Sequence, residues 1–179
     1  MEQILSMEDV KNSIRNIPDY PKKGIQFKDL TTALKQQDIF AYILDELTTM
    51  YSGRDITKVV GIESRGFILG GALAASIGAG FVPLRKAGKL PADKYTINYS
   101  LEYGEDSIEI HKDAIEPGEI ILLHDDLLAT GGTSLAALKL LSKFKPEEIY
   151  LNYIVELDFL EGRKAIGDDY DISSLVHYS

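Results

Sequence analysis

Short apolar runs rich in β-branched residues alternate with helical segments along this chain, and that order restricts the possible folds. The runs typical of buried strands are residues 57–62, 80–84, 119–124 and 149–157. The segments with apolar residues every three or four positions, typical of helices, are residues 38–51, 67–77 and 133–144. This order predicts an α/β fold with right-handed crossovers and a mainly parallel sheet covered by helices on both faces.

Three segments depart from this simple alternation. Residues 99–103 and 107–111 are expected to form two strands that interrupt the alternation of strand and helix. Residues 86–98 show no clear period of apolar residues. Near the N-terminus, Ser6 and Asp9 have the spacing of a capping box, which predicts a helix that extends to about Ile17. Parallel sheets bind ligands beyond the carboxyl ends of their strands, so candidate site residues should follow the predicted strands.

Composition narrows the class of protein. The chain has 179 residues, a length that favours one domain. Its net charge of -9 argues against nucleic-acid binding, because phosphate neutralisation needs a basic face. There is no cysteine, which excludes disulfides, thiolate metal sites and cysteine nucleophiles. A reducing cytoplasm fits this composition, and we expect a cytoplasmic protein.

No segment predicts membrane insertion. The first residues are acidic and mixed, unlike a secretory leader. Residues 66–84 carry no charge and are long enough to span a bilayer. They include five glycines and Pro83, so a buried helix followed by a buried strand is the better interpretation.

The most informative segment is residues 124–134, where a predicted strand leads into Asp125 and Asp126, then a loop of small residues, then a helix. Gly131 and Gly132 permit positive φ angles and close approach of a ligand to the backbone. Amides gathered at a helix N-terminus suit a phosphate, whereas the two acids suit hydroxyl groups or a divalent cation. Together they favour a ribose phosphate. The alternative is a capped turn with solvated aspartates. The loop lacks the lysine of a Walker A motif and the spacing of a dinucleotide fingerprint.

Residues 125–133 read DDLLATGGT, which resembles the phosphoribosyl-pyrophosphate (PRPP) motif of the type I phosphoribosyltransferases, especially their adenine-specific members. Four other segments agree, so the resemblance covers about residues 14–178. It implies the type I fold, with a mainly parallel five-stranded sheet, in one domain over residues 1–179. It also implies a small hood at residues 1–35 and a mobile catalytic loop at residues 86–104.

The resemblance assigns the PRPP contacts. Residues expected to bind the ribose and 5′-phosphate are Asp125, Asp126, Ala129, Thr130, Gly131, Gly132 and Thr133. Residues expected to bind pyrophosphate are Glu63, Ser64, Arg65, Arg85, Lys86 and Lys89. A cation opposes the helix dipole at a helix start, so a plain surface charge is the weaker alternative for Arg65. For residues 85–89 the alternative is a flexible loop with incidental cations.

The resemblance also assigns catalytic and adenine-binding residues. Catalysis is expected to involve Glu102, Arg65 and Lys89, with Glu102 as general acid/base at the purine. Adenine is expected to contact Gln26, Phe27, Lys28 and Leu127. For Phe27 alone, a small satellite core is the alternative. Lys23 and Thr32 depart from the family pattern in this region. The histidines His111, His124 and His177 lack metal-ligand spacing, so each is expected to be structural.

The implied activity is purine salvage: transfer of a phosphoribosyl group from PRPP to adenine, with Mg²⁺ held mainly by PRPP rather than by a protein metal site. Similar enzymes are homodimers, so a homodimer is expected, with neither nucleic-acid nor membrane partners. Two alternatives remain. One is a transferase for a 6-oxo purine such as hypoxanthine, guanine or xanthine. The other is a non-enzymatic PRPP-sensing regulator, which the acidic net charge disfavours.

Overall fold

The computed structural model describes residues 4–20, 22–101 and 104–179. The chain forms two compact units, the first ending at Met50 and the second running from Tyr51 to Ser179. Each unit is described by itself. The expected single domain over residues 1–179 stays a prediction.

The first unit contains short elements and one long helix. Its elements are α1 (Met7–Ser13), β1 (Arg15–Pro18), β2 (Gln26–Asp29), α2 (Thr31–Leu34) and α3 (Gln37–Tyr51), whose last residue opens the second unit. The predicted helix over residues 38–51 is thus confirmed. The predicted capping box is present, because the Ser6 amide donates to Asp9 Oδ2 at 2.9 Å and the Asp9 amide donates to Ser6 Oγ at 3.4 Å.

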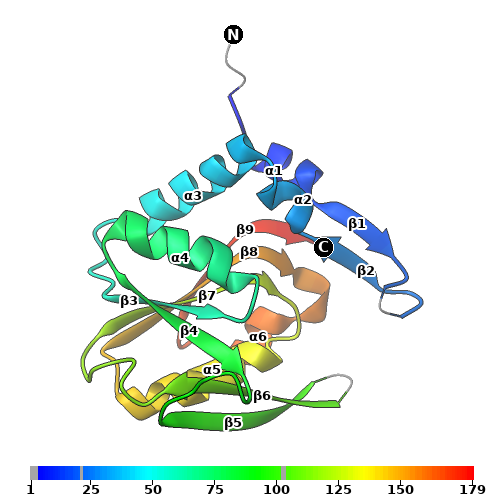
Figure 1. Ribbon diagram of the computed structural model, residues 1–179. Coiled ribbons are helices and arrows are strands. Elements are labelled where there is room, and N and C mark those ends of the chain that lie inside the picture. The colour runs from blue at the N-terminus through cyan, green and yellow to red at the C-terminus, as the bar shows by residue number, and fades with distance from the viewer. Residues whose placement is uncertain (1–3, 21, 102–103) are drawn as a thin grey trace. The chain divides into compact units, whose positions relative to one another are not determined.

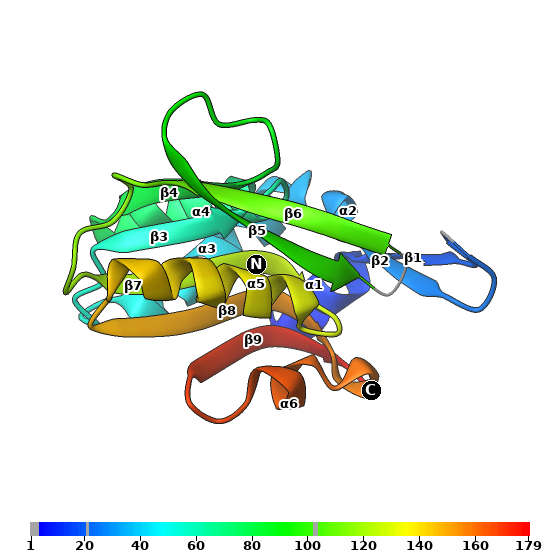
Figure 2. The same ribbon diagram turned by 90° about the horizontal axis from the view of Figure 1, so that it is seen from below.

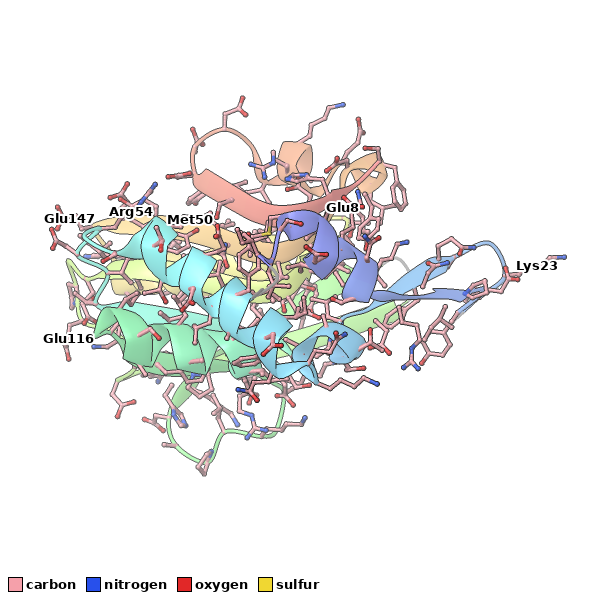
Figure 3. All side chains as sticks on the ribbon, turned by 90° about the horizontal axis from the view of Figure 1, so that it is seen from above. Glu8, Lys23, Met50, Arg54, Glu116 and Glu147 are labelled. Carbon is pink, nitrogen blue, oxygen red and sulfur yellow. The ribbon has the colours of Figure 1, made fainter. Side chains whose placement is uncertain are left out.

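The predicted extent of the N-terminal helix was wrong. The helix α1 ends at Ser13, and Ile17 lies in β1, paired with Phe27 of the antiparallel strand β2. Pro18 lacks an amide hydrogen and disfavours a helical residue before it, so cross-strand pairing replaces the last helical turn. Lys23, one of the departures from the family pattern, lies exposed at the tip of the connection between these strands (Figure 3).

The second unit is built on a seven-stranded sheet in the order β5-β6-β4-β3-β7-β8-β9. Its strands are β3 (Lys58–Ile62), β4 (Gly80–Lys86), β5 (Lys94–Leu101), β6 (Gly104–His111), β7 (Ile120–Leu128), β8 (Glu148–Leu157) and β9 (Asp171–Tyr178). The five strands β4-β3-β7-β8-β9 are parallel, as predicted. The antiparallel hairpin β5-β6 extends them to seven, because β6 pairs with the end of β4.

Helices cover both faces of this sheet (Figures 1 and 2). The helix α4 (Gly66–Ile77) lies on one face, and α5 (Gly132–Leu141), extended by a 3₁₀ turn (Ser142–Phe144), lies on the other. A short helix, α6 (Gly162–Ile166), connects β8 to β9. The uncharged stretch of residues 66–84 is a helix followed by a strand, as predicted. In the described part of the chain, every helix is too short or too polar to cross a membrane.

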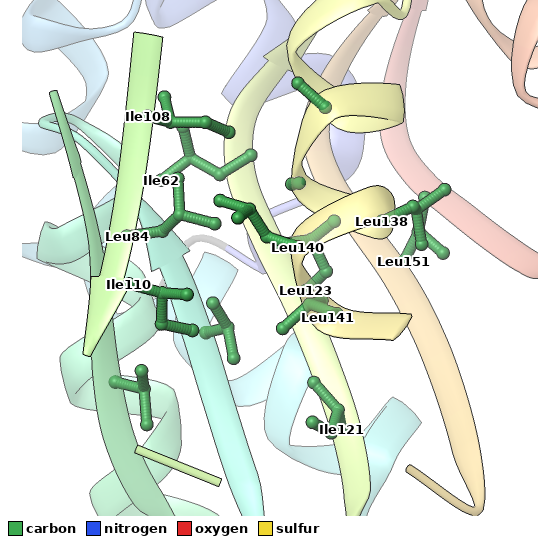
Figure 4. Close-up of a cluster of buried hydrophobic side chains, with 14 of the residues drawn as sticks. Ile62, Leu84, Ile108, Ile110, Ile121, Leu123, Leu138, Leu140, Leu141 and Leu151 are labelled. Carbon is green, nitrogen blue, oxygen red and sulfur yellow. The ribbon is translucent and has the colours of Figure 1, made fainter. Parts of the chain in front are cut away.

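The main core lies between the sheet and α5 (Figure 4). Its fully or nearly fully buried side chains include Leu84, Ile110, Leu123, Leu140 and Leu141. The hairpin β5-β6 contributes Ile108 and Ile110 to the same core, and the ring of Tyr95 packs edge-on against Phe144 at 5.5 Å. The helix α5 therefore packs against the parallel strands and against the hairpin.

The hairpin is longer than expected. Residues 94–98, for which no strand was predicted, belong to β5 and pair with β6. Tyr95, Ile97 and Tyr99 alternate along this strand and pack against the core. Among the described residues of the predicted loop, residues 87–93 connect β4 to β5.

A line of polar side chains connects β7, β8 and the edge strand β9. His124 of β7 is fully buried, and its Nδ1 lies 2.8 Å from Asn152 Oδ1 on β8. Asn152 Nδ2 donates to Ser173 Oγ on β9 at 3.0 Å, and Ser173 in turn hydrogen-bonds to the Tyr51 hydroxyl. Burial lowers the pKa of His124, so this histidine is neutral and structural.

Candidate active site

A cavity of about 580 Å³ opens where β3 and β4 end and β7 nears its end. Its lining residues are Ile62, Glu63, Ser64, Arg65, Lys86, Lys89, Tyr99, Asp106, Ile108, Asp125, Asp126 and Thr133. The cavity thus brings together most of the predicted pyrophosphate residues and both predicted ribose carboxylates. It lies at the carboxyl edge of the parallel sheet, where ligands of such folds bind.

Asp125 and Asp126 lie inside β7 rather than after it. The strand was predicted to end at His124, but it pairs with β8 as far as Leu128 and Glu156. Asp125 Oδ1 accepts the Asp126 amide at 2.8 Å. Burial, and then the neighbouring Asp126 carboxylate, raise the pKa of Asp125 well above its usual value.

Arg65 reaches this acid pair because α4 begins unusually close to β7. A Cβ on Gly66, the first residue of α4, would lie 2.9 Å from the carbonyl oxygen of His124. Glycine is therefore needed for this approach. Arg65 Nε hydrogen-bonds to the buried carboxylate of Asp126, and the preceding peptide bond between Glu63 and Ser64 is cis.

The Glu63 carboxylate contacts three of the residues predicted to bind pyrophosphate. It accepts the Lys86 amide at 2.9 Å and Arg85 Nε at 3.3 Å, and it pairs with Lys89 Nζ. Burial raises the pKa of Glu63, but the three donors outweigh burial and hold it below its usual value. The Glu63 side chain therefore acts as the counter-charge of these cations.

Four cavity residues were not predicted as site residues from the sequence: Ile62, the last residue of β3, and Tyr99, Asp106 and Ile108 on the hairpin. Lys86 Nζ pairs with Asp106 at 3.1 Å, and this contact raises the pKa of Lys86. The Thr133 hydroxyl lies 3.4 Å from the Tyr99 hydroxyl. Apart from the alternation of Ile108 with its neighbours, no sequence pattern connects these positions with the acid pair.

The glycine loop (residues 129–133) lines a smaller hollow of about 70 Å³ beside Asp125 and Leu127. Gly131 has a φ of 82° and caps α5, whereas Gly132 is the first residue of that helix. Only Gly131 therefore uses the positive φ that was considered for both glycines. Because Gly131 has no side chain, the first amides of α5 are left for another partner, which suits an anion.

The remaining predicted residues fall elsewhere. Gln26, Phe27 and Lys28 form part of β2 in the first unit, where the ring of Phe27 packs against Tyr20 at 5.3 Å. Leu127 lies beside the glycine loop in the second unit. Glu102 lies outside the described residues. Base binding by the first four residues and proton transfer by Glu102 stay predictions.

Comparisons with known proteins agree with this geometry. Residues 31–175 match the phosphoribosyl transferase domain family. The chain is 52% identical to the adenine phosphoribosyltransferase of Phocaeicola vulgatus over 172 residues, which cover 96% of this chain and 99% of the relative.

Solved structures extend the likeness to three dimensions. Adenine phosphoribosyltransferase from Thermoanaerobacter pseudethanolicus has a TM-score of 0.92 at 47% identity, covering 97% of this chain and all of that one. The enzyme from Giardia lamblia, complexed with 9-deazaadenine, has a TM-score of 0.93 at 44% identity, covering 98% and 99%. The chain therefore belongs to the phosphoribosyltransferase family and has its type I fold. The proteins it is similar to within that family are adenine phosphoribosyltransferases.

Proposed function

We propose that this protein transfers the 5-phosphoribosyl group of PRPP to adenine, forming AMP and pyrophosphate. One observation carries the proposal: a glycine loop, an acid pair and a cationic cluster meet at one edge of the sheet. Identity of about half to adenine phosphoribosyltransferases over nearly the whole chain supports adenine as the base.

Each part of the site suits one part of PRPP. The amides of residues 129–133 suit the 5′-phosphate, because they lie at the start of α5. Asp125 and Asp126 suit the ribose hydroxyls, which donate hydrogen bonds to carboxylates. Residues 85–89 and Arg65 suit the pyrophosphate, because ion pairs with Glu63 and Asp126 hold their cations in place for an anion.

In the reaction, adenine N9 forms a bond to the anomeric carbon while the bond to pyrophosphate oxygen breaks. Positive charge develops on the sugar ring and negative charge on the departing pyrophosphate. Arg65 and Lys89 would stabilise the leaving group, and Asp125 and Asp126 would stabilise the ring. Glu102 would take the proton that leaves the purine, a role that rests on the family resemblance. Replacing Glu102 by alanine should then lower kcat more than KM, and an unchanged kcat would remove it from proton transfer.

Magnesium is proposed as part of the PRPP complex. The acid pair offers hard carboxylate oxygens beside the cavity, the donors that Mg²⁺ prefers, so the residues present fit this ion. The pyrophosphate oxygens would hold most of its coordination shell, with Asp125 and Asp126 nearby. When bound, Mg²⁺ would neutralise charge on the leaving group.

A panel of bases tests the activity and the base preference. Purified protein is mixed with PRPP, Mg²⁺ and one of adenine, hypoxanthine, guanine or xanthine, and nucleotide is measured by chromatography. We expect AMP from adenine at a much higher rate than nucleotide from any other base. A preference for a 6-oxo purine would refute adenine specificity, and Gln26, Phe27, Lys28 and Leu127 would lose their proposed role. No nucleotide from any base would refute the activity.

We also propose a cytoplasmic homodimer. The side chains of Ile68 on α4 and Phe81 on β4 are 47% and 36% exposed, although both are large and apolar. A second copy covering this surface would remove them from water. Light scattering should therefore give about 40 kDa, twice the 19.9 kDa of one chain. A mass near 20 kDa would exclude the dimer.

A further inference from the structure

The glycine loop is backed by a second glycine that lies far along the chain. Gly162, the first residue of α6, is buried against the loop. A Cβ on Gly162 would overlap the carbonyl oxygen of Ala129 and come within 3.0 Å of Leu128 Cδ1. In the other direction, a Cβ on Gly131 would lie 2.8 Å from the carbonyl oxygen of Gly162. Two bare backbones therefore touch, with no room for a side chain on either.

The neighbouring residue fixes Gly162 in place. Arg163 donates from Nε and Nη2 to the two carboxylate oxygens of Glu156, at 3.0 and 2.6 Å, and from Nη1 to the carbonyl oxygen of Ile172 at 2.7 Å. Glu156 is only 4% exposed, and it also accepts the Ser174 hydroxyl at 2.6 Å. This bidentate ion pair connects α6 to β8, which lies next to β7, and to β9 at the edge of the sheet.

The glycine loop is therefore held from two sides. Its last residues start α5, where the Leu135 amide donates to the carbonyl oxygen of Gly131 at 2.9 Å. Its first residues rest against Gly162. A backbone that rests on another backbone has no flexible side chain to absorb a shift, so a displacement of α6 would move the loop amides.

We propose that Gly162 is a positioning residue for the 5′-phosphate, held in place by the Arg163–Glu156 ion pair. This inference rests on the proposed function and deepens it. Gly162 touches the loop and not the ligand, and it sets where residues 129–131 place their amides. The other two ligand parts, pyrophosphate and base, are assigned to other segments. A change at Gly162 should therefore weaken ligands through their 5′-phosphate and leave pyrophosphate binding intact.

The test replaces Gly162 by alanine and measures binding by calorimetry with two probes, ribose 5-phosphate and pyrophosphate. The matched control is Gly71→Ala, because a Cβ at Gly71 meets nothing within 4 Å and the position is helical. For Gly162→Ala, we expect the Kd for ribose 5-phosphate to rise about tenfold or more, with pyrophosphate affinity unchanged. The KM for PRPP should rise, while the KM for adenine stays at its wild-type value. Gly71→Ala should match the wild type with both probes.

A second variant covers the case in which Gly162→Ala does not fold. Arg163→Lys keeps the charge but loses the bidentate contact with Glu156. It should therefore also raise the Kd for ribose 5-phosphate, by a smaller factor than Gly162→Ala. Wild-type affinity for ribose 5-phosphate in a folded variant would overturn the positioning role. An equal loss with both probes would also overturn it, because that pattern indicates general damage. If the wild type neither binds ribose 5-phosphate nor makes AMP, the proposed function falls too.

Discussion

Every cation that the described residues place on the large cavity is paired with a carboxylate. The pairs are Arg65 with Asp126, Lys86 with Asp106, and Lys89 with Glu63. The site thus holds its positive charges in position before an anion arrives, which lowers the reorganisation that ligand binding requires. Asp125 differs from these carboxylates, because burial and the neighbouring carboxylate of Asp126 raise its pKa.

Replacing Asp125 by asparagine should separate activity from stability. We expect kcat/KM to fall by about 10²-fold or more, because a group that faces the positive ring is lost. Stability at neutral pH should rise. The pKa of Asp125 is raised in the folded protein, so wild-type stability declines as pH rises from the unfolded pKa, about 3.9, to the higher folded pKa.

Urea unfolding at a series of pH values checks the change at Asp125. The gain in stability of Asp125→Asn should be absent at low pH and should grow as pH rises through that window. Asp126→Asn is the matched comparison, and it should instead lose stability, because Arg65 loses its buried partner. Near-normal turnover of Asp125→Asn, or a stability difference independent of pH, would contradict this account.

Glu63→Gln tests the carboxylate that holds Arg85 and Lys89. The pKa of Glu63 is lowered in the folded protein, so its stabilising effect is present above the unfolded pKa and is lost as pH falls through the folded pKa. We expect a loss of about 1 kcal/mol at neutral pH that shrinks in acid. Urea midpoints from neutral to acid pH measure it, with the exposed Glu147→Gln as control. An equal loss at all pH values would exclude the ionic explanation.

At the scale of elements, α5 stands out because it contributes many buried side chains to the main core. Leu141 is one of them and is fully buried. Leu141→Ala should lower the free energy of unfolding by about 2–5 kcal/mol, the usual loss for a large core side chain. Chemical denaturation measures this, and Lys139→Ala on the exposed side of the same helix should change it by less than about 0.5 kcal/mol. A small loss at Leu141 would contradict its place in the core between α5 and the sheet.

The sequence predicted those elements whose apolar residues have a clear period. The helices over residues 38–51, 67–77 and 133–144 were found because their buried faces repeat every three or four positions. The family resemblance implied five strands, but the sequence pattern did not locate β9, because most of its side chains are only partly buried and Ser173 and Ser174 interrupt its apolar run. Residues 94–98 were also missed, although Tyr95, Ile97 and Tyr99 alternate with polar residues and pack against the core, which is the period of a strand.

The candidate site was predicted unevenly for the same reason. The glycine loop and the acid pair are contiguous in sequence, so their chemistry can be recognised together. Asp106 and Tyr99 reach the cavity only because the hairpin pairs with the end of β4. The contact between Gly162 and Ala129 joins segments more than thirty residues apart. Nothing in the sequence around Gly162 distinguishes it from other glycines of the chain.

At the scale of the whole molecule, an acidic chain presents a cationic cluster to an anionic substrate. The net charge is -9, while three cations lie within residues 85–89. Added salt screens exposed charges over a Debye length of about 10 Å at 0.1 M. We therefore expect the KM for PRPP to rise with ionic strength and the KM for adenine, a neutral base, to stay constant.

Initial rates at several concentrations of potassium chloride measure this effect. Lys89→Met should reduce the salt dependence of the KM for PRPP, because it removes one of the charges that salt screens. Lys139→Met, on the exposed face of α5, should leave the dependence unchanged. Equal salt sensitivity for both substrates would count against a cationic site for PRPP.

The polar line from His124 through Asn152 to Ser173 has a consequence for strand alignment. Side chains along a strand alternate with a period of two, so a slip of two residues would keep every apolar side chain on its own face. Such a slip would move β8 by about 6.6 Å along β7 and carry Glu156 away from the level of Leu128. It would also leave the buried polar atoms of His124 and Asn152 without hydrogen-bond partners. Two fully buried polar residues thus disfavour the misalignment that hydrophobicity alone would tolerate.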